Sequence, residues 1–130
     1  MGGFLIVFLG AGLGGSLRHG VNLAAARLLG MGFPYGTLSV NVAGSLAMGL
    51  LAGWFALKAD PGQPWRLFLT TGVLGGFTTF SAFSLDAVLL WERGEAGAAL
   101  LYVLASVGVS LGALFGGLAL ARQIAQGAVA

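Results

Sequence analysis

Cysteine is absent from this chain of 130 residues, and only one residue is a histidine. Without cysteine the chain can form neither a disulfide nor a thiolate metal site. His19 alone cannot supply the several side-chain ligands that a metal site needs. No paired nucleophile and base stands out either. These absences predict that the chain is not an enzyme.

Charged residues are also scarce. They make up 8% of the chain against 58% hydrophobic residues, and the mean hydropathy is +0.96. A soluble domain of this size could not cover its surface with so few charges. The six lysines and arginines exceed the four acidic residues only slightly, which gives no basis for binding nucleic acid. We therefore expect a membrane protein with no nucleic-acid partner.

Long apolar stretches take the place of the missing charges. A helix needs about 20 apolar residues to cross a hydrocarbon core of roughly 30 Å. Four stretches of the chain meet this requirement, at about 4–29, 35–57, 66–91 and 97–122. The connections between them are short. The sequence therefore predicts an all-α protein whose residues 1–130 form a single domain of four transmembrane helices.

The third stretch contains a segment unlike the rest, residues 75–83, with the sequence GGFTTFSAF. Its glycines and hydroxyl residues favour a break in the helix at a depth where the bilayer supplies no water. Backbone groups freed by such a break must be satisfied by protein or by something bound, and transporters use such breaks to hold ions. We predict that the third helix is broken mid-membrane and that the chain forms an ion pathway.

Polar side chains also lie inside other spans. Tyr102, Ser106 and Ser110 are spaced i, i+4 and i+8, which places them in one stripe on one face of a helix. Such a stripe can line a polar track beside a pore, or its serines can bond back to carbonyls of their own helix. Asn41 must find a hydrogen-bonding partner inside the membrane, either as a link between helices or as a pore ligand whose NH2 group donates to an anion.

Charged and aromatic residues extend this set. Arg18 lies well inside the first span, where it either faces a cavity or partner or extends to an interface. Asp86 follows the expected break by about two turns and can pair with a cation or lie near the headgroups. Phe80 and Phe83 are three residues apart and share a face. The edge of a phenyl ring is positive and can favour an anion weakly, as conduction requires.

The positive charges give no clear orientation. Lys58, Arg66 and Arg122 would lie on one side of the membrane, and Arg27 and Arg93 on the other, with Arg18 further into the first span. Either other features set one topology, or the chain inserts both ways, which predicts an antiparallel homodimer. GxxxG spacing recurs at Gly10–Gly14, Gly49–Gly53, Gly72–Gly76 and Gly108–Gly112–Gly116. It allows close helix contacts, either between subunits or within one.

These residues resemble the Fluc (CrcB-type) fluoride channels of microbes over essentially the whole chain. Segment 75–83 is similar to the family's highly specific GGxTTFSTF signature, with Ala82 in place of the usual threonine. Segment 36–41, GTLSVN, is similar to its second-helix GTLxVN motif. Segment 14–18, GGSLR, is similar to its first-helix glycine–arginine motif, with His19 where an aromatic residue often follows. The stripe that begins at Tyr102 is similar to the family's fourth-helix polar track.

The resemblance implies a fluoride-selective channel, built as an antiparallel dual-topology homodimer with two pores. Ring edges of Phe80 and Phe83 would face fluoride, and Asn41 would donate a hydrogen bond to it. Arg18 would attract anions at the entry vestibule. The polar track would consist of hydroxyl groups, with Thr79 close to those of Tyr102, Ser106 and Ser110.

The resemblance also implies a structural sodium ion where the two broken helices cross at the dimer centre. The backbone carbonyls of Gly75 and Thr78 from each subunit would hold it. The expected role is passive fluoride efflux through the inner (plasma) membrane of a bacterial cell, which lowers cytoplasmic fluoride. The expected partners are fluoride, a second copy of the chain and membrane lipid.

Two other classes remain open at this point. A small multidrug-resistance-type exporter also has about this length, four spans and an antiparallel arrangement. It would need a membrane-embedded carboxylate in the first helix, and the first span has none. A structural subunit of a larger complex would use its polar residues only for helix packing. The hydroxyl stripe, Asn41 and the expected break in one chain argue against that class.

Overall fold

A computed structural model describes residues 2–57 and 62–129, so that Lys58 lies outside the described part. Within that part all regular structure is helical, which confirms the all-α class. The helices are α1 (Gly2–Leu29), α2 (Tyr35–Leu57), α3 (Gln63–Arg66), the π-helix η1 (Leu67–Leu74), α4 (Gly75–Phe77), α5 (Phe80–Glu92) and α6 (Ala96–Val129). We call the run from α3 to α5 the broken helix. By length and composition, α1, α2, the broken helix and α6 can each cross a membrane.

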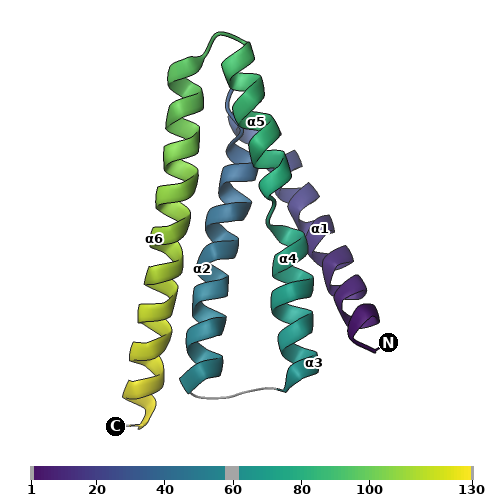
Figure 1. The fold of residues 1–130 in the computed structure, drawn as a ribbon, viewed down its shortest axis with the longest axis vertical. Coiled ribbons are helices and arrows are strands. Elements are labelled where there is room, and N and C mark those ends of the chain that lie inside the picture. Colours follow the sequence, from purple (N-terminus) through teal and green to yellow (C-terminus); the bar gives the residue numbers. More distant parts are fainter. Residues whose placement is uncertain (1, 58–61, 130) are drawn as a thin grey trace.

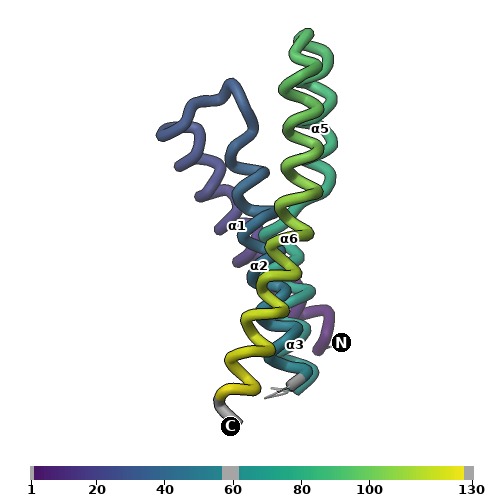
Figure 2. The backbone as a smooth tube through the Cα atoms, turned by 90° about the vertical axis from the view of Figure 1, so that its left-hand side faces the viewer, coloured from purple at the N-terminus to yellow at the C-terminus, as the bar shows by residue number. Residues whose placement is uncertain are grey.

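The four long segments lie roughly side by side (Figure 1). α2 packs along α6, and the half of the broken helix that includes η1 and α4 packs on α1. The other half, α5, leans across to α6. The view at right angles shows the α1–α2 turn and the α5–α6 turn diverging at one end of the molecule (Figure 2). The two halves of the broken helix therefore have different neighbours.

The break in the third helix is confirmed at Thr78 and Thr79. α4 ends at Phe77, and both threonines are extended, with φ and ψ of −91° and 162° at Thr78 and −156° and 127° at Thr79. α5 then begins at Phe80. The Thr79 hydroxyl accepts a hydrogen bond from the backbone N–H of Ala82 at 3.1 Å, a common way for threonine to cap the start of a helix.

Glycines explain how closely α1 approaches the broken helix. A Cβ atom on Gly14 would collide with the backbone carbonyl oxygen of Val73, and one on Gly10 would lie 2.9 Å from the Cα atom of Gly72. A Cβ on Gly76 would lie 2.5 Å from the carbonyl oxygen of Ala11. Only glycine permits such contact between backbones. The first and third GxxxG pairs therefore pack against each other within one chain.

The other two GxxxG sets differ from each other. A Cβ atom on Gly49 of α2 would collide with the carbonyl oxygen of Leu114 of α6, so this glycine is also used inside the chain. By contrast, nothing lies within 4 Å of a Cβ placed on Gly108, Gly112 or Gly116. At about 100° per residue these three positions lie about 200° around α6 from the hydroxyl stripe. This glycine face of α6 is open in the single chain.

α6 continues past its predicted end at residue 122, to Val129. Its 34 residues span about 51 Å at 1.5 Å per residue, more than the roughly 30 Å of a hydrocarbon core. Ala121 and Ala125 are one turn apart and both only 2% exposed. This buried alanine face reaches into the part of α6 that extends beyond the expected span.

Candidate functional site

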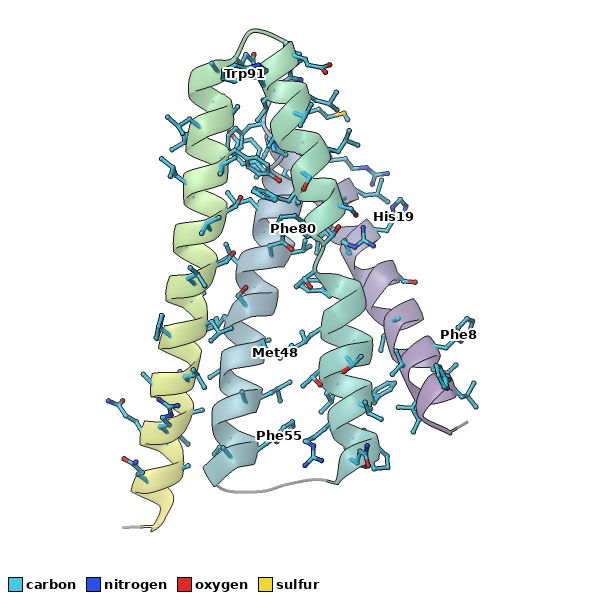
Figure 3. The ribbon with its side chains drawn as sticks, viewed as in Figure 1. Phe8, His19, Met48, Phe55, Phe80 and Trp91 are labelled. Atoms are coloured by element: carbon cyan, nitrogen blue, oxygen red, sulfur yellow. The ribbon has the colours of Figure 1, made fainter. Side chains whose placement is uncertain are left out.

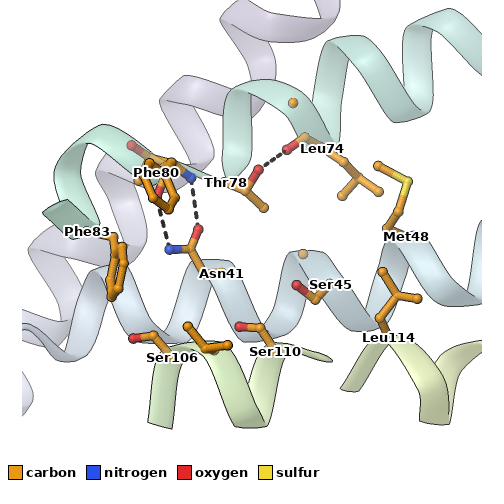
Figure 4. Close-up of a pocket in the computed structure, with 14 residues that line it drawn as sticks. Asn41, Ser45, Met48, Leu74, Thr78, Phe80, Phe83, Ser106, Ser110 and Leu114 are labelled. Carbon is orange, nitrogen blue, oxygen red and sulfur yellow. Dashed lines mark hydrogen bonds between the residues drawn. The ribbon is translucent and has the colours of Figure 1, made fainter. Parts of the chain in front are cut away.

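A cavity of about 350 Å³ lies between α2, α6 and the broken helix (Figure 4). Its walls contain six of the seven residues that the sequence singles out for the pore: Asn41, Thr79, Phe80, Phe83, Ser106 and Ser110. Gly75 and Thr78, the predicted sodium ligands, line it as well. Among the described residues, the lining contains no charged side chain. The cavity therefore offers neutral donors and acceptors at the point where the helix breaks.

Asn41 of α2 holds the break in place through two hydrogen bonds. Its side-chain Nδ2 donates to the carbonyl oxygen of Thr79 at 3.0 Å, and its Oδ1 accepts from the backbone N–H of Thr79 at 2.8 Å. These are the two dashed bonds at Asn41 in Figure 4. An amide NH2 group has two donor hydrogens, so one N–H of Asn41 is left over. Asn41 is thus a link between helices, and the spare N–H also permits the predicted role toward an anion.

The hydrogen bonds around the break release two backbone carbonyls. In an uninterrupted helix the carbonyl of Gly75 would accept from the N–H of Thr79, and that of Thr78 from the N–H of Ala82. Here the Thr79 N–H donates to Asn41, and the Ala82 N–H donates to the Thr79 hydroxyl. Both carbonyls therefore lose their helical partners. They belong to residues that line the cavity, and such oxygens suit a hard cation.

Arg18 of α1 reaches the other side of the break. Its Nε donates to the carbonyl oxygen of Gly76 at 3.1 Å, and the side chain is half-buried. Gly76 is the middle residue of α4, so Arg18 satisfies a carbonyl close to the break. Arg18 does not line the cavity. The guanidinium thus turns towards the protein, as an arginine inside a span is expected to do.

The serines of the α6 stripe have free hydroxyl groups. Ser106 and Ser110 have buried Oγ atoms with no hydrogen-bonding partner in the part of the chain that the structure describes. Four other hydroxyls behave differently and donate to the carbonyl four residues earlier: those of Ser16, Thr70, Thr78 and Ser84. The alternative that the stripe serines bond back to their own helix therefore does not describe Ser106 and Ser110. Their hydroxyls are available to whatever enters the cavity.

Tyr102, the first residue of the stripe, differs from the two serines. It is fully buried, and its hydroxyl donates to Oδ2 of Asp86 at 3.2 Å. Asp86 thus pairs with a tyrosine of α6. Asp86 also belongs to a second pocket, of about 360 Å³, with Asn22, Thr37 and Arg93. Tyr102 does not line the first cavity. The stripe therefore consists of Tyr102, whose hydroxyl is bonded to Asp86, and of Ser106 and Ser110, whose hydroxyls are free.

Aromatic rings continue from the cavity to Tyr102. The ring centroids of Phe80 and Phe83 are 5.6 Å apart, and those of Phe83 and Tyr102 are 5.3 Å apart. The ring of Phe83 thus packs between the rings of Phe80 and Tyr102. Phe80 is 79% exposed, so its ring is largely uncovered in the single chain (Figure 3).

Sequence reasoning missed two features of the site. Ser45 lines the cavity, and its position four residues after Asn41 on a helix was a usable signal. The pairing of Asp86 with Tyr102 had no signal in the spacing, because the two residues lie on different helices.

Comparison with known proteins places the chain in a family. The family model described as "CrcB-like protein, Camphor Resistance (CrcB)" matches residues 5–118. A protein of Methylobacterium nodulans named "Fluoride-specific ion channel FluC" is 66% identical over 119 residues, which cover 92% of this chain and 95% of the relative. Proteins of the same name are 60% identical in Rhodopseudomonas palustris strain BisB5, over 121 residues (93% and 98%), and in Hyphomonas neptunium, over 125 residues (95% and 98%).

These matches decide between the classes that the sequence left open. The relatives are named as ion channels, which confirms the expectation that the chain is not an enzyme. They give no support to the multidrug exporter or to the structural subunit. With its four long apolar helices, the chain is a multi-pass membrane protein and belongs to the CrcB family.

Proposed function

We propose that the chain is a fluoride-selective channel that lets fluoride leave the cell passively and so lowers cytoplasmic fluoride. The observation that carries the proposal is the cavity at the helix break, where Ser106 and Ser110 present buried hydroxyls without partners. A buried hydroxyl without a partner is costly, so this arrangement favours an occupant that accepts hydrogen bonds. The relatives named as fluoride-specific channels support fluoride as that occupant.

The mechanism follows from the donors present. Fluoride is small and strongly hydrated, so the path must replace its water with N–H, O–H and ring-edge contacts. The free groups are the hydroxyls of Ser106 and Ser110, the spare N–H of Asn41 and the uncovered ring of Phe80. All are neutral, so none traps the ion, as conduction requires. Thr79 and Phe83 shape the wall, and Arg18 beside the break raises the local anion concentration.

We propose that the functional unit is an antiparallel, dual-topology homodimer with two pores. Three features support it: the balanced positive charges, the open face at Gly108, Gly112 and Gly116, and the uncovered Phe80 ring at the cavity. A second copy would cover that ring and complete the wall. The native chain has no cysteine, so a single cysteine can be introduced at one chain end and labelled to test the topology. Labelling of one end from both sides of intact membranes supports dual insertion, and labelling from one side only contradicts it.

We further propose that a structural sodium ion binds between the two breaks. The chemistry fits, because the carbonyls of Gly75 and Thr78 lack helical partners and a second copy would double the number of oxygens. When bound, sodium supplies positive charge that holds the crossing helices together. Dimer stability should rise with sodium and not with an equal concentration of N-methylglucamine. Equal stability in the two salts would contradict the site.

The proposed location is the inner membrane of a bacterial cell, with lipid as a partner. Large apolar side chains such as Phe4 and Phe8 on α1 are exposed in the chain and would face lipid.

Fluoride efflux from liposomes tests the function directly. Purified protein is reconstituted, and fluoride release is followed with a fluoride electrode against chloride-loaded vesicles as the control. The proposal expects rapid fluoride release and negligible chloride release. Folded protein that releases no fluoride, or releases both ions alike, would contradict it.

A further inference from the structure

Ser45 on α2 faces the same cavity as the serines of α6. Along α2 the cavity-lining side chains are Asn41, Ser45 and Met48, spaced as one helix face. Along α6 they are Ser106, Ser110 and Leu114. Both walls thus run from polar to apolar residues in the same direction (Figure 4). Ser45 and Ser110 are the last hydroxyl residues before the apolar end that Met48 and Leu114 form.

The Ser45 hydroxyl is also free. In the described residues it makes no hydrogen bond, unlike Ser16 and Ser84, which donate to carbonyls of their own helices at 2.7 Å and 2.9 Å. A hydroxyl can donate one hydrogen bond and accept two. Three serine O–H donors therefore line the cavity from two helices: Ser45 from α2, and Ser106 and Ser110 from α6.

We propose that Ser45, together with Ser110, forms an additional fluoride-binding position at the end of the cavity opposite to Phe83. This inference rests on the proposed function. Beyond this pair the described walls offer Met48, Leu74 and Leu114, whose side chains cannot donate hydrogen bonds (Figure 4). An ion that has left Asn41 and Ser106 must therefore be held by the Ser45–Ser110 pair before it leaves the cavity. Donors from opposite helices can enclose a small ion, whereas α6 alone offers donors from one side only.

The first test compares fluoride efflux rates of single variants in liposomes. Ser45→Ala should slow efflux about three- to tenfold, the effect of losing one neutral hydrogen bond. Ser45→Thr, which keeps the hydroxyl, should recover most of the rate. The matched control is Ser84→Ala, which removes a hydroxyl already bonded to its own helix. Ser45→Ala at the unsubstituted rate would overturn the inference while leaving the channel function standing.

A second test does not depend on transport. The native chain has no cysteine, so Ser45→Cys introduces a single thiol. In folded, detergent-solubilised protein a small water-soluble methanethiosulfonate should modify this thiol. Fluoride should slow the reaction increasingly as its concentration rises, and an equal concentration of chloride should not.

The outcomes separate the two proposals. A thiol at position 45 that is unreactive, or reacts equally fast with and without fluoride, overturns the inference about Ser45 alone. No fluoride efflux from the folded, unsubstituted protein overturns the proposed function and the inference with it. Slowed efflux together with fluoride-specific protection supports both.

Discussion

Two regions of the molecule use the broken helix in opposite ways. Where η1 and α4 cross α1, backbone meets backbone, and glycines remove the side chains that would separate them. Where the break faces α2 and α6, a cavity of about 350 Å³ remains, with serine hydroxyls that have no partner. The first region brings two backbones into direct contact, whereas the second keeps an open cavity and hydroxyls without partners among the described residues. The tight crossing holds the helix in place, which allows the chain to leave polar groups unsatisfied a short distance away.

The largest expected effect comes from filling the tight crossing. Gly14→Leu would place side-chain atoms into the Val73 carbonyl, which cannot move unless the helices separate. We expect a loss of stability at or above the usual overpacking cost of about 1–3 kcal/mol, and little folded protein. The measurement is the monodisperse fraction in detergent, with the thermal unfolding midpoint. Gly12→Leu on the same helix is the control, because a Cβ there meets nothing within 4 Å. Equal folding of the two variants would show that the crossing is not tight.

The next largest effect is expected at Asn41, which contacts the break between the two regions. Asn41→Ala leaves the N–H and C=O of Thr79 without partners, at about 1–3 kcal/mol for each group. We expect stability to fall by about 2 kcal/mol or more and fluoride efflux to be lost. Denaturation in detergent and liposome efflux measure the two effects. Asn41→Asp keeps an acceptor for the Thr79 N–H but places a carboxylate beside the Thr79 carbonyl oxygen inside the span, so it should lose both stability and transport. Fluoride efflux by Asn41→Asp at the unsubstituted rate would show that Asn41 does not line the fluoride path.

A smaller effect, confined to the cavity, is expected at Phe80. Phe80→Ile keeps an apolar side chain but removes the ring edge. Since aromatic interactions contribute roughly 0.5–1.5 kcal/mol, efflux should fall on the order of tenfold while assembly changes less. Phe8→Ile is the control, because Phe8 is an exposed aromatic on α1 outside the cavity (Figure 3). Liposome efflux at an unchanged rate for Phe80→Ile would count against the ring-edge role.

The smallest effect on stability is expected from a stripe serine. Ser110→Ala removes a buried hydroxyl that has no partner, so the free energy of unfolding should stay within about 0.5 kcal/mol or rise slightly. Fluoride efflux should nevertheless slow a few-fold. Parallel unfolding and efflux measurements, with Ser84→Ala alongside, check the contrast. A marked loss of stability in Ser110→Ala would show that this serine serves packing, like the glycines of the crossing.

Much of the fold followed from local pattern. The lengths of the apolar stretches located the four helices, and the cluster of glycine and hydroxyl residues located the break at Thr78 and Thr79. The helix α6 extends to Val129, beyond residue 122, at which the expected span ends. The buried alanines at 121 and 125 show that packing continues beyond it. The hydrophobic pattern of a sequence can therefore locate a helix. How far that helix packs against the rest of the protein depends on the neighbouring helix.

The amino-acid sequence by itself determined the class of protein, the four spans, the break and the face of α6 that carries hydroxyls, because these depend on composition and on periodicity along one helix. Only the tertiary structure decided which groups are bonded. It shows that Asn41 binds both backbone groups of Thr79, that Tyr102 pairs with Asp86, and that Ser106 and Ser110 have no partner. The physical reason is that a hydrogen bond between helices depends on their relative rotation and depth. Those are set by glycine contacts between segments distant in sequence, which no local pattern records.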